Sequence, residues 1–351
     1  MEPGCLNTRY RGTPKLLDFR SFSLLTISLL ISYACFSRNS EINFVITRYF
    51  FIFTMYQTHF GLKELPFRIS PDPRFIYLTS QHQEVLAKCQ YSVAEKMGIA
   101  AIFGTIGSGK TSLARRLWEQ YATQPEYTFA LLVHPNYPTP FQFLKAILRE
   151  YGLIKPKRSL EDMVTYFEEF LIEQHKSGKT PILVIDEAQT LRPPALELLR
   201  QLLNFETNTE KLLQIILFGD NDLLLRLDRS PALKDRVTIF GALTSLSRQD
   251  SDDLIAFRYR VAGGDSLPFG QDALAAIFKY SQGLPRRICR ICDNALIRAF
   301  SNKLQTVDEA MITSIAEEIR LNETTAPTKQ KAGRKPRQKI PEVATQVERT
   351  V

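Results

Sequence analysis

The sequence predicts an α/β fold in which a parallel sheet is sandwiched between helices and followed by a small all-helical lid domain. Two patterns support this fold class. Up to about residue 245, short apolar runs typical of buried strands alternate with helical patterns, as they do in a parallel sheet with crossover helices. Beyond residue 246 the strand-like runs stop and helical patterns follow. The expected strands are 99–103, 128–133, 182–185, 213–218 and 237–240, and the expected helices are 81–97, 110–122, 140–151, 160–176, 194–205, 247–262, 271–281, 285–301 and 307–320.

A glycine-rich motif joins the first expected strand to the helix that follows it. It has the G-x-x-x-x-G-K-[ST] pattern of a phosphate-binding P-loop, in the strand–loop–helix setting that this motif requires. The glycines let consecutive backbone N–H groups turn toward phosphates, and the helix N-terminus adds positive potential. We therefore expect ATP and Mg²⁺ as cofactors, rather than a chance glycine-rich turn. The motif consists of Gly104, Thr105, Ile106, Gly107, Ser108, Gly109, Lys110 and Thr111.

Within this motif, two side chains carry specific chemistry. Lys110 would reach the β- and γ-phosphates, and the Thr111 hydroxyl would bind Mg²⁺. A second motif supports this assignment, since the apolar strand 181–185 ends in Asp186 and Glu187. Ligands gather where parallel strands end, so Asp186 would help to hold Mg²⁺ and Glu187 would polarise the attacking water. Such a strand end is usually only solvated, but downstream of a P-loop it indicates a Walker B element.

The charge of the chain is concentrated at its two ends. The net charge is +8; residues 1–54 contain six Lys/Arg and three Asp/Glu, and residues 326–351 contain seven and two. Residues 55–325 are therefore neutral overall. The segment 324–351 is too polar to form a core, so we expect a disordered basic tail. It would contact DNA phosphates in a salt-dependent way or act only as a solubilising tail.

The first 54 residues have an unusual composition. Their apolar runs are shorter than the roughly 18–20 residues that a membrane span requires. The segment has the charge-then-apolar layout of a signal peptide, but export would separate an ATPase from its nucleotide. We favour a translation start at Met55, with a membrane-associating arm as the alternative. Cys289 and Cys292 form a C-x-x-C without further ligands, which favours two reduced helix cysteines over a zinc site.

Several motifs together resemble those of the ExeA-like AAA+ ATPases, also called general secretion pathway protein A. The resemblance covers about residues 55–320 and is specific at 55–75, 186–189 and 283–296. It implies a P-loop AAA+ sandwich at 55–245, a helical lid at 246–323, ATP hydrolysis and a homo-oligomer. It also supports the start at Met55.

The resemblance implies roles for further residues. Arg286 resembles the sensor 2 arginine that reaches from the lid to the γ-phosphate; the alternatives are Arg287, or a solvated helix start. Arg236 lies where this superfamily carries an arginine finger that acts in a neighbouring subunit. Asp220 occupies the sensor 1 position, where relatives carry glutamine and where a carboxylate would repel the γ-phosphate. Asn221 would then take over, or hydrolysis would be slow.

Three other positions are less specific. His134 ends the second strand, where a small polar residue is expected. Phe75 and Tyr77 would pack on adenine or belong to the core.

The function expected from these motifs is that of a cytoplasmic AAA+ ATPase. The inner face of the inner membrane is the alternative location. It would remodel or regulate a partner complex, with secretion or type IV pilus assembly preferred. Membrane contact would come only through a partner or through residues 1–54. One alternative is a DNA-associated ATPase that regulates transposition. The other is a nucleotide-dependent binding switch that hydrolyses ATP slowly, suggested by Asp220.

Overall fold

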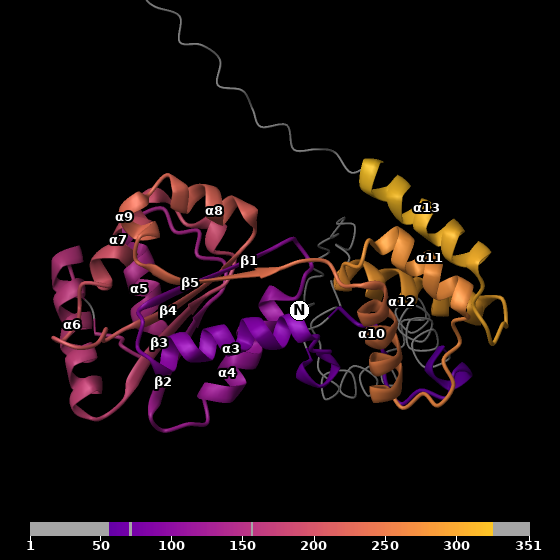
Figure 1. Cartoon of the computed structure of the whole chain (residues 1–351), viewed down its shortest axis with the longest axis horizontal. Coiled ribbons are helices and arrows are strands. Elements are labelled where there is room, and N and C mark those ends of the chain that lie inside the picture. The colour runs from indigo at the N-terminus through magenta and orange to yellow at the C-terminus, as the bar shows by residue number, and fades with distance from the viewer. Residues whose placement is uncertain (1–55, 70–71, 156, 326–351) are drawn as a thin grey trace, which may run out of the picture.

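A computed structural model describes residues 56–325, apart from 70, 71 and 156. It contains a five-stranded parallel sheet flanked by helices and, beside it, a helical unit (Figure 1). The strand order is β2-β3-β4-β1-β5, so the chain crosses over between strands. The predicted α/β sandwich with a helical lid is confirmed. The strands are β1 (Ile99–Gly104), β2 (Tyr127–Leu132), β3 (Thr180–Ile185), β4 (Gln214–Gly219) and β5 (Val237–Leu243).

The helices cover both faces of the sheet. α3 and α4 pack on one face against side chains such as Ile102 and Ile216, and helices from α5 to α9 pack on the other face, against Phe103 and Leu217 among others. Burial on both faces explains why the central strands read as continuous apolar runs. The helices of this unit are α3 (Ser80–Ala94), α4 (Lys110–Tyr121), α5 (Pro140–Glu150), α6 (Leu160–Lys176), α7 (Pro193–Leu202), α8 (Asn221–Asp228) and α9 (Pro231–Lys234), with the 3₁₀ turn η3 (Ala188–Thr190). A second 3₁₀ turn, η2 (Pro73–Phe75), precedes α3, and its Phe75 is buried in the lid cluster.

The lid is formed by the last four helices of the described chain. Its core is a separate apolar cluster, which includes Ile277, Ile288 and Leu296. Each of these helices matches an expected one to within a few residues, except that the last runs on to 325 instead of ending at 320. The lid helices are α10 (Arg248–Val261), α11 (Gln271–Ser281), α12 (Pro285–Ser301) and α13 (Glu309–Thr325).

Sequence patterns missed two short helices and the end of one strand. α8 and α9 are too short to show a clear periodicity, and the sequence patterns predict no helix between the strands 213–218 and 237–240. β5 continues to Leu243 instead of ending at Phe240. It does so through Gly241, where a Cβ would lie 2.6 Å from Ile102 Cδ1, so a larger residue would require the Ile102 side chain to move.

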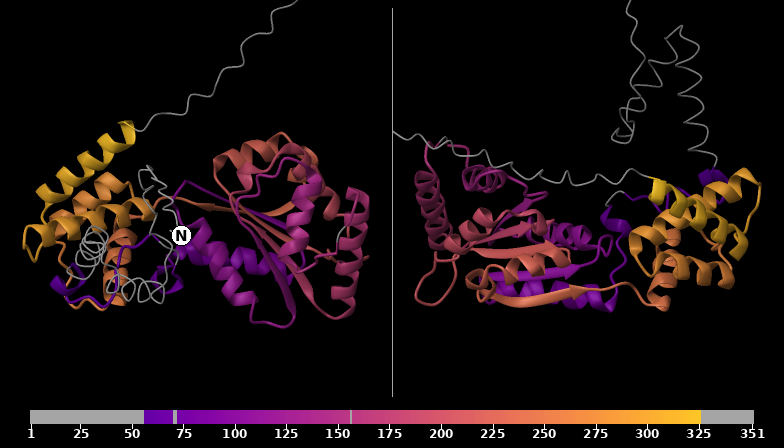
Figure 2. Two further views of the ribbon diagram at one scale, coloured as in Figure 1. Left: turned by 180° about the vertical axis from the view of Figure 1, so that it is seen from behind. Right: turned by 90° about the horizontal axis from the view of Figure 1, so that it is seen from above.

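The segment before α3 packs with the lid, although the predicted boundaries place it with the sheet. Tyr56, Leu62 and Phe67 are buried in the apolar cluster of the lid, and the Lys63 amide donates to the Ala262 carbonyl at 2.8 Å. The segment is the indigo strip beside the orange helices in Figure 2. The chain thus passes through the lid before it reaches the sheet.

The remaining predictions about organisation have mixed outcomes. The predictions for residues 1–54 and for the basic tail beyond 325 lie outside the described residues. No helix within 56–325 combines the length and apolarity needed to cross a bilayer. Cys289 and Cys292 are buried free thiols on α12, and burial raises the pKa of both, as expected for reduced core cysteines.

Candidate nucleotide-binding site

The P-loop lies between β1 and α4 with its glycines in conformations that other residues rarely adopt. Gly107 has φ 86° and Gly109 has φ 104°, both in the left-handed region that glycine occupies without strain. Both are also crowded. A Cβ at 107 would lie 2.9 Å from Arg286 Cβ, and one at 109 would lie 3.1 Å from His82 Nε2. Backbone geometry and close packing therefore both require glycine here.

Lys110 is held inside the P-loop. Its ammonium donates to the carbonyls of Gly104 at 2.8 Å and Thr105 at 3.0 Å, and the residue is only 6% exposed. Burial lowers the pKa of Lys110, and the charges of Glu187 and Asp186 oppose this shift. The lysine is thus positioned by backbone carbonyls, which an arriving phosphate could replace as acceptor.

The hydroxyl of Ser108 is a second sign that the loop is built for a ligand. Its Oγ is buried and has no hydrogen-bond partner within the described part of the chain, and buried polar atoms without partners are rare. The cation Lys110, the helix N-terminus and this free hydroxyl together suit a polyphosphate. The residues present therefore fit ATP.

Thr111 and Asp186 meet as a metal site requires. The Thr111 hydroxyl donates to Asp186 Oδ2 at 2.6 Å, although the two residues come from α4 and the end of β3. Asp186 is 1% exposed, and its Oδ1 accepts the Glu187 amide at 2.9 Å. Hard oxygen ligands, few from protein and the rest from phosphate and water, are what Mg²⁺ prefers. The pair therefore fits Mg²⁺.

Glu187 follows with a strained backbone and an anchored side chain. Its φ of 53° and ψ of 36° lie in the left-handed region, and strain of this kind concentrates at functional sites. Gln189 Nε2 donates to Glu187 Oε2 at 2.6 Å, while Gln189 Oε1 accepts the backbone N–H of Asp220 at 3.2 Å. Sequence reasoning gave Gln189 no role, although it lies within the motif 186–189.

Asp220, at the predicted sensor 1 position, is the N-terminal cap of α8. Its carboxylate accepts the Asp222 amide at 2.9 Å and thereby caps α8. Its charge opposes the lowering of the Lys110 pKa by burial, so Asp220 belongs to the same electrostatic environment. Asn221 is exposed and lines, with Thr105 among others, a hollow of about 380 Å³ between the P-loop, the end of β5 and the lid.

Arg286 is placed against the P-loop. Its amide approaches the Gly107 carbonyl at 3.4 Å, and its Cβ borders the space above Gly107. Its neighbour Arg287 instead donates to Gln282 at 3.4 Å. Both side chains are exposed, but the contacts with Gly107 place only Arg286 against the P-loop, which makes it the better candidate of the two for sensor 2.

Arg236 is not brought to the P-loop of its own chain. It precedes β5 and so lies at the amino edge of the sheet, opposite to the P-loop. Its guanidinium donates to the Arg200 carbonyl at 2.9 Å and to Asn204 Oδ1 at 2.5 Å, near the end of α7. Any contact with a nucleotide would have to be made across a subunit interface.

His82 is a residue at this site that sequence reasoning missed. It is buried on α3, where its Nδ1 bonds the Thr79 hydroxyl at 2.7 Å and its Nε2 bonds the Ser108 carbonyl at 3.1 Å. Because a carbonyl only accepts, Nε2 carries the proton, and Nδ1 accepts from Thr79 in the neutral ring. Burial lowers the pKa of His82. His82 therefore supports the P-loop through its hydrogen bond to the Ser108 carbonyl.

Two of the three less specific positions, Phe75 and Tyr77, take part in packing contacts. Phe75 is buried in the lid cluster beneath the Arg258 guanidinium, 5.5 Å from its ring centroid, so it belongs to the core. Tyr77 packs against Phe257 with ring centroids 5.6 Å apart. His134 is exposed at the end of β2, in a left-handed conformation with φ 57°.

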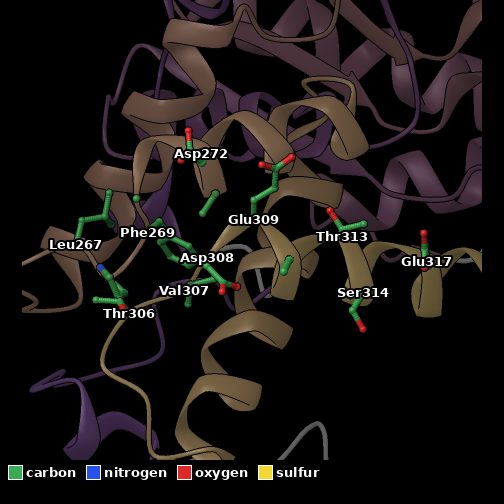
Figure 3. Close-up of a pocket in the computed structure, with 14 residues that line it drawn as sticks. Leu267, Phe269, Asp272, Thr306, Val307, Asp308, Glu309, Thr313, Ser314 and Glu317 are labelled. Carbon is green, nitrogen blue, oxygen red and sulfur yellow. The ribbon is translucent and has the colours of Figure 1, made fainter.

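A larger hollow, of about 900 Å³, lies wholly within the lid (Figure 3). It is lined by residues of α11, α13 and the loops before them, among them Asp272, Asp308, Glu309 and Glu317. Acidic side chains repel phosphate, and no residue of the P-loop lines this hollow. It is therefore not the nucleotide site.

The strand order, the P-loop after β1, the carboxylates after β3 and the helical lid define an AAA+ P-loop protein. Residues 94–227 match the family described as AAA domain. Within this class the chain belongs to the ExeA-like family. Over 268 residues it is 37% identical to General secretion pathway protein A of Aeromonas hydrophila, covering 76% of this chain and 48% of that protein. The chain thus spans about half the length of this relative.

Solved structures with the same fold are more distant in sequence. ORC2 of Aeropyrum pernix, solved as ADPNP-ADP complexes, superposes with a TM-score of 0.55 at 16% identity over 72% of this chain and 71% of that one. Cdc6p of Pyrobaculum aerophilum gives 0.57 at 18% identity over 72% and 70%. At these identities the comparison supports the AAA+ fold alone.

Proposed function

We propose that this protein binds ATP with Mg²⁺ and hydrolyses it. The observation that carries the proposal is the Thr111–Asp186 contact beside Glu187, which brings α4 and the end of β3 together as a phosphate and metal site needs. Thr111 and Asp186 would hold Mg²⁺, which neutralises charge on the phosphates. Lys110 would bind the β- and γ-phosphates, and Glu187 would accept a proton from the attacking water.

Two arginines complete the proposed site. Arg286 would extend from the lid over the P-loop and stabilise charge on the γ-phosphate of its own subunit, since its backbone already contacts Gly107. Arg236 would act on the nucleotide of a neighbouring subunit, because it lies at the opposite edge of the sheet. Hydrolysis would then require a homo-oligomer.

We further propose that the ATPase remodels or regulates a secretion or type IV pilus assembly from the cytoplasmic side. The identity to General secretion pathway protein A over 76% of the chain supports this. Because the chain covers only 48% of that relative, the proposed partner class is based on sequence similarity alone.

Glu187→Gln tests the chemistry. The substitution keeps the size and the hydrogen-bonding reach of the side chain but removes the base, so ATP affinity should change little while turnover falls about 100-fold or more. Binding is measured by titration with a fluorescent ATP analogue, and turnover by phosphate release. A variant that hydrolyses ATP at the wild-type rate would falsify the role of Glu187. A wild type that binds ATP without turnover would favour the slow-hydrolysing switch.

DNA binding separates the proposed partner class from transposition regulation. Because residues 55–325 are neutral overall, DNA affinity should depend on the tail, fall steeply with salt and disappear when 326–351 is deleted. The measurement is fluorescence anisotropy of labelled duplex DNA in a salt series, with a non-hydrolysable ATP analogue. Tight, ATP-dependent binding by the tail-deleted protein would contradict the secretion or pilus proposal and support the DNA-associated one.

A further inference from the structure

The side chain of Gln189 bridges the ends of two neighbouring strands. Its Nε2 donates to Glu187 Oε2 at 2.6 Å, beyond the end of β3, and its Oε1 accepts the Asp220 amide at 3.2 Å, beyond the end of β4. The general-base candidate is therefore linked to the sensor 1 position through one carboxamide.

The orientation of this carboxamide is fixed by its partners. A backbone N–H can only donate, so the oxygen of Gln189 must face Asp220, and the NH₂ group must then face the Glu187 carboxylate. A donor directed at a carboxylate restrains one of its oxygens and leaves the other for water. The backbone of Glu187 is held by its amide, which donates to Asp186 Oδ1 at 2.9 Å, whereas the contact with Gln189 orients its partly exposed carboxylate.

Gly219, the last residue of β4, lies beside this bridge. At Gly219, a Cβ would lie 2.7 Å from Leu223 Cδ2 and 3.2 Å from Gln189 Oε1. The end of β4 thus approaches the Gln189 carboxamide closely.

We propose that Gln189 is a positioning residue that holds Glu187 in register with the end of β4, and that ATP hydrolysis depends on this bridge. The inference rests on the proposed ATPase function and assigns no contact between Gln189 and the nucleotide. It predicts an effect on turnover rather than on ATP affinity, since the P-loop and the Thr111–Asp186 contact do not involve Gln189.

The test compares two substitutions in the full chain. Gln189→Ala removes both hydrogen bonds, and turnover should fall about 10- to 100-fold, as small displacements of a catalytic group do, with the ATP dissociation constant within about threefold of wild type. Gln189→Glu keeps the shape and the acceptor but places two carboxylates together. The pair should share a proton at lower pH, so turnover relative to wild type should rise as the pH falls from about 8 to about 6.

Gln201 provides a matched control, because on α7 it also donates to a glutamate, Glu197, at 3.5 Å. Gln201→Ala and Gln201→Glu should leave turnover and its pH profile unchanged. A Gln189→Ala protein with wild-type turnover, or a Gln189→Glu protein whose pH profile parallels wild type, would overturn the positioning role alone. If wild type binds ATP but shows no turnover, the proposed hydrolysis fails and this role fails with it, whereas retained ATP binding by each variant shows that it is folded.

Discussion

The two edges of the parallel sheet use charged residues in opposite ways. At the amino edge, charged side chains are held by fixed partners within the fold: Glu210 pairs with Lys96 at 2.7 Å and lies 3.1 Å from His175 Nδ1, and Arg236 donates to the Arg200 carbonyl at the end of α7. At the carboxyl edge, Lys110 donates to backbone carbonyls, although several carboxylates lie near enough to oppose the lowering of its pKa by burial.

This difference separates charges that hold the fold from charges that await a ligand. A partly exposed pair such as Lys96–Glu210 contributes about 0–1 kcal/mol to stability. A buried ammonium held by carbonyls, beside a hydroxyl–carboxylate contact, can instead exchange its partners for phosphate and metal. Clustered charge without mutual pairing therefore distinguishes the carboxyl edge of the sheet from its amino edge.

The prediction with the largest effect concerns Arg236, the residue at the amino edge for which we propose a role in catalysis. If it acts in a neighbouring subunit, Arg236→Ala should lose about 10³-fold in turnover, as arginine fingers do. Mixing it with Lys110→Ala should restore part of the activity, because one interface in the mixed oligomer keeps an intact site and an intact finger. Phosphate release is measured across mixing ratios.

Oligomer formation by each variant, checked by light scattering, is the control for this experiment. Oligomers that form and yet recover no activity at any ratio would show that Arg236 serves only to fasten α7.

The next prediction contrasts two lysines from the two edges. Lys110→Ala should abolish ATP binding, a loss on the order of 100-fold or more in affinity, because a buried charge that contacts phosphate is removed. Lys96→Ala should leave affinity unchanged and lower the free energy of unfolding by at most about 1 kcal/mol. Titration with a fluorescent ATP analogue and urea unfolding measure the two effects. An equal loss of ATP affinity in both variants would contradict the proposed difference between the carboxyl and amino edges of the sheet.

The smallest expected effect is a pH dependence through His82. Its native pKa is below the usual value of 6.5, so the unfolded chain binds more protons in the interval between the two values. The stability that neutral His82 contributes is therefore complete above about pH 6.5 and is lost as the pH falls through the native pKa. The loss is limited to about 1.4 kcal/mol per pH unit. Asp250, whose charge opposes the shift, moderates it.

Thermal unfolding and ATP affinity between about pH 5 and 8 would show this dependence. His82→Gln should remove the part of the pH response that comes from the P-loop, whereas His175→Gln at the amino edge should leave ATP affinity as pH-dependent as in wild type. An unchanged response in His82→Gln would exclude His82 as its source.

Sequence alone determined the parts of this protein that local patterns encode. The strands are continuous apolar runs because both faces of the sheet are buried, and the P-loop glycines are required by local backbone conformation. Lys110, Thr111 and Asp186 could be placed at one edge because parallel strands end together. Only the tertiary structure decided which residues distant in sequence contact and position the groups of this site.

His82 meets Ser108 across 26 residues and Gln189 meets Asp220 across 31, and neither contact leaves a periodic signal in the sequence. The segment before α3 likewise has no pattern that assigns it to the lid, because its apolar side chains would fit any core. Spacing along the chain specifies helices, strands and turns, whereas these contacts depend on how the crossovers and the lid bring separate elements together.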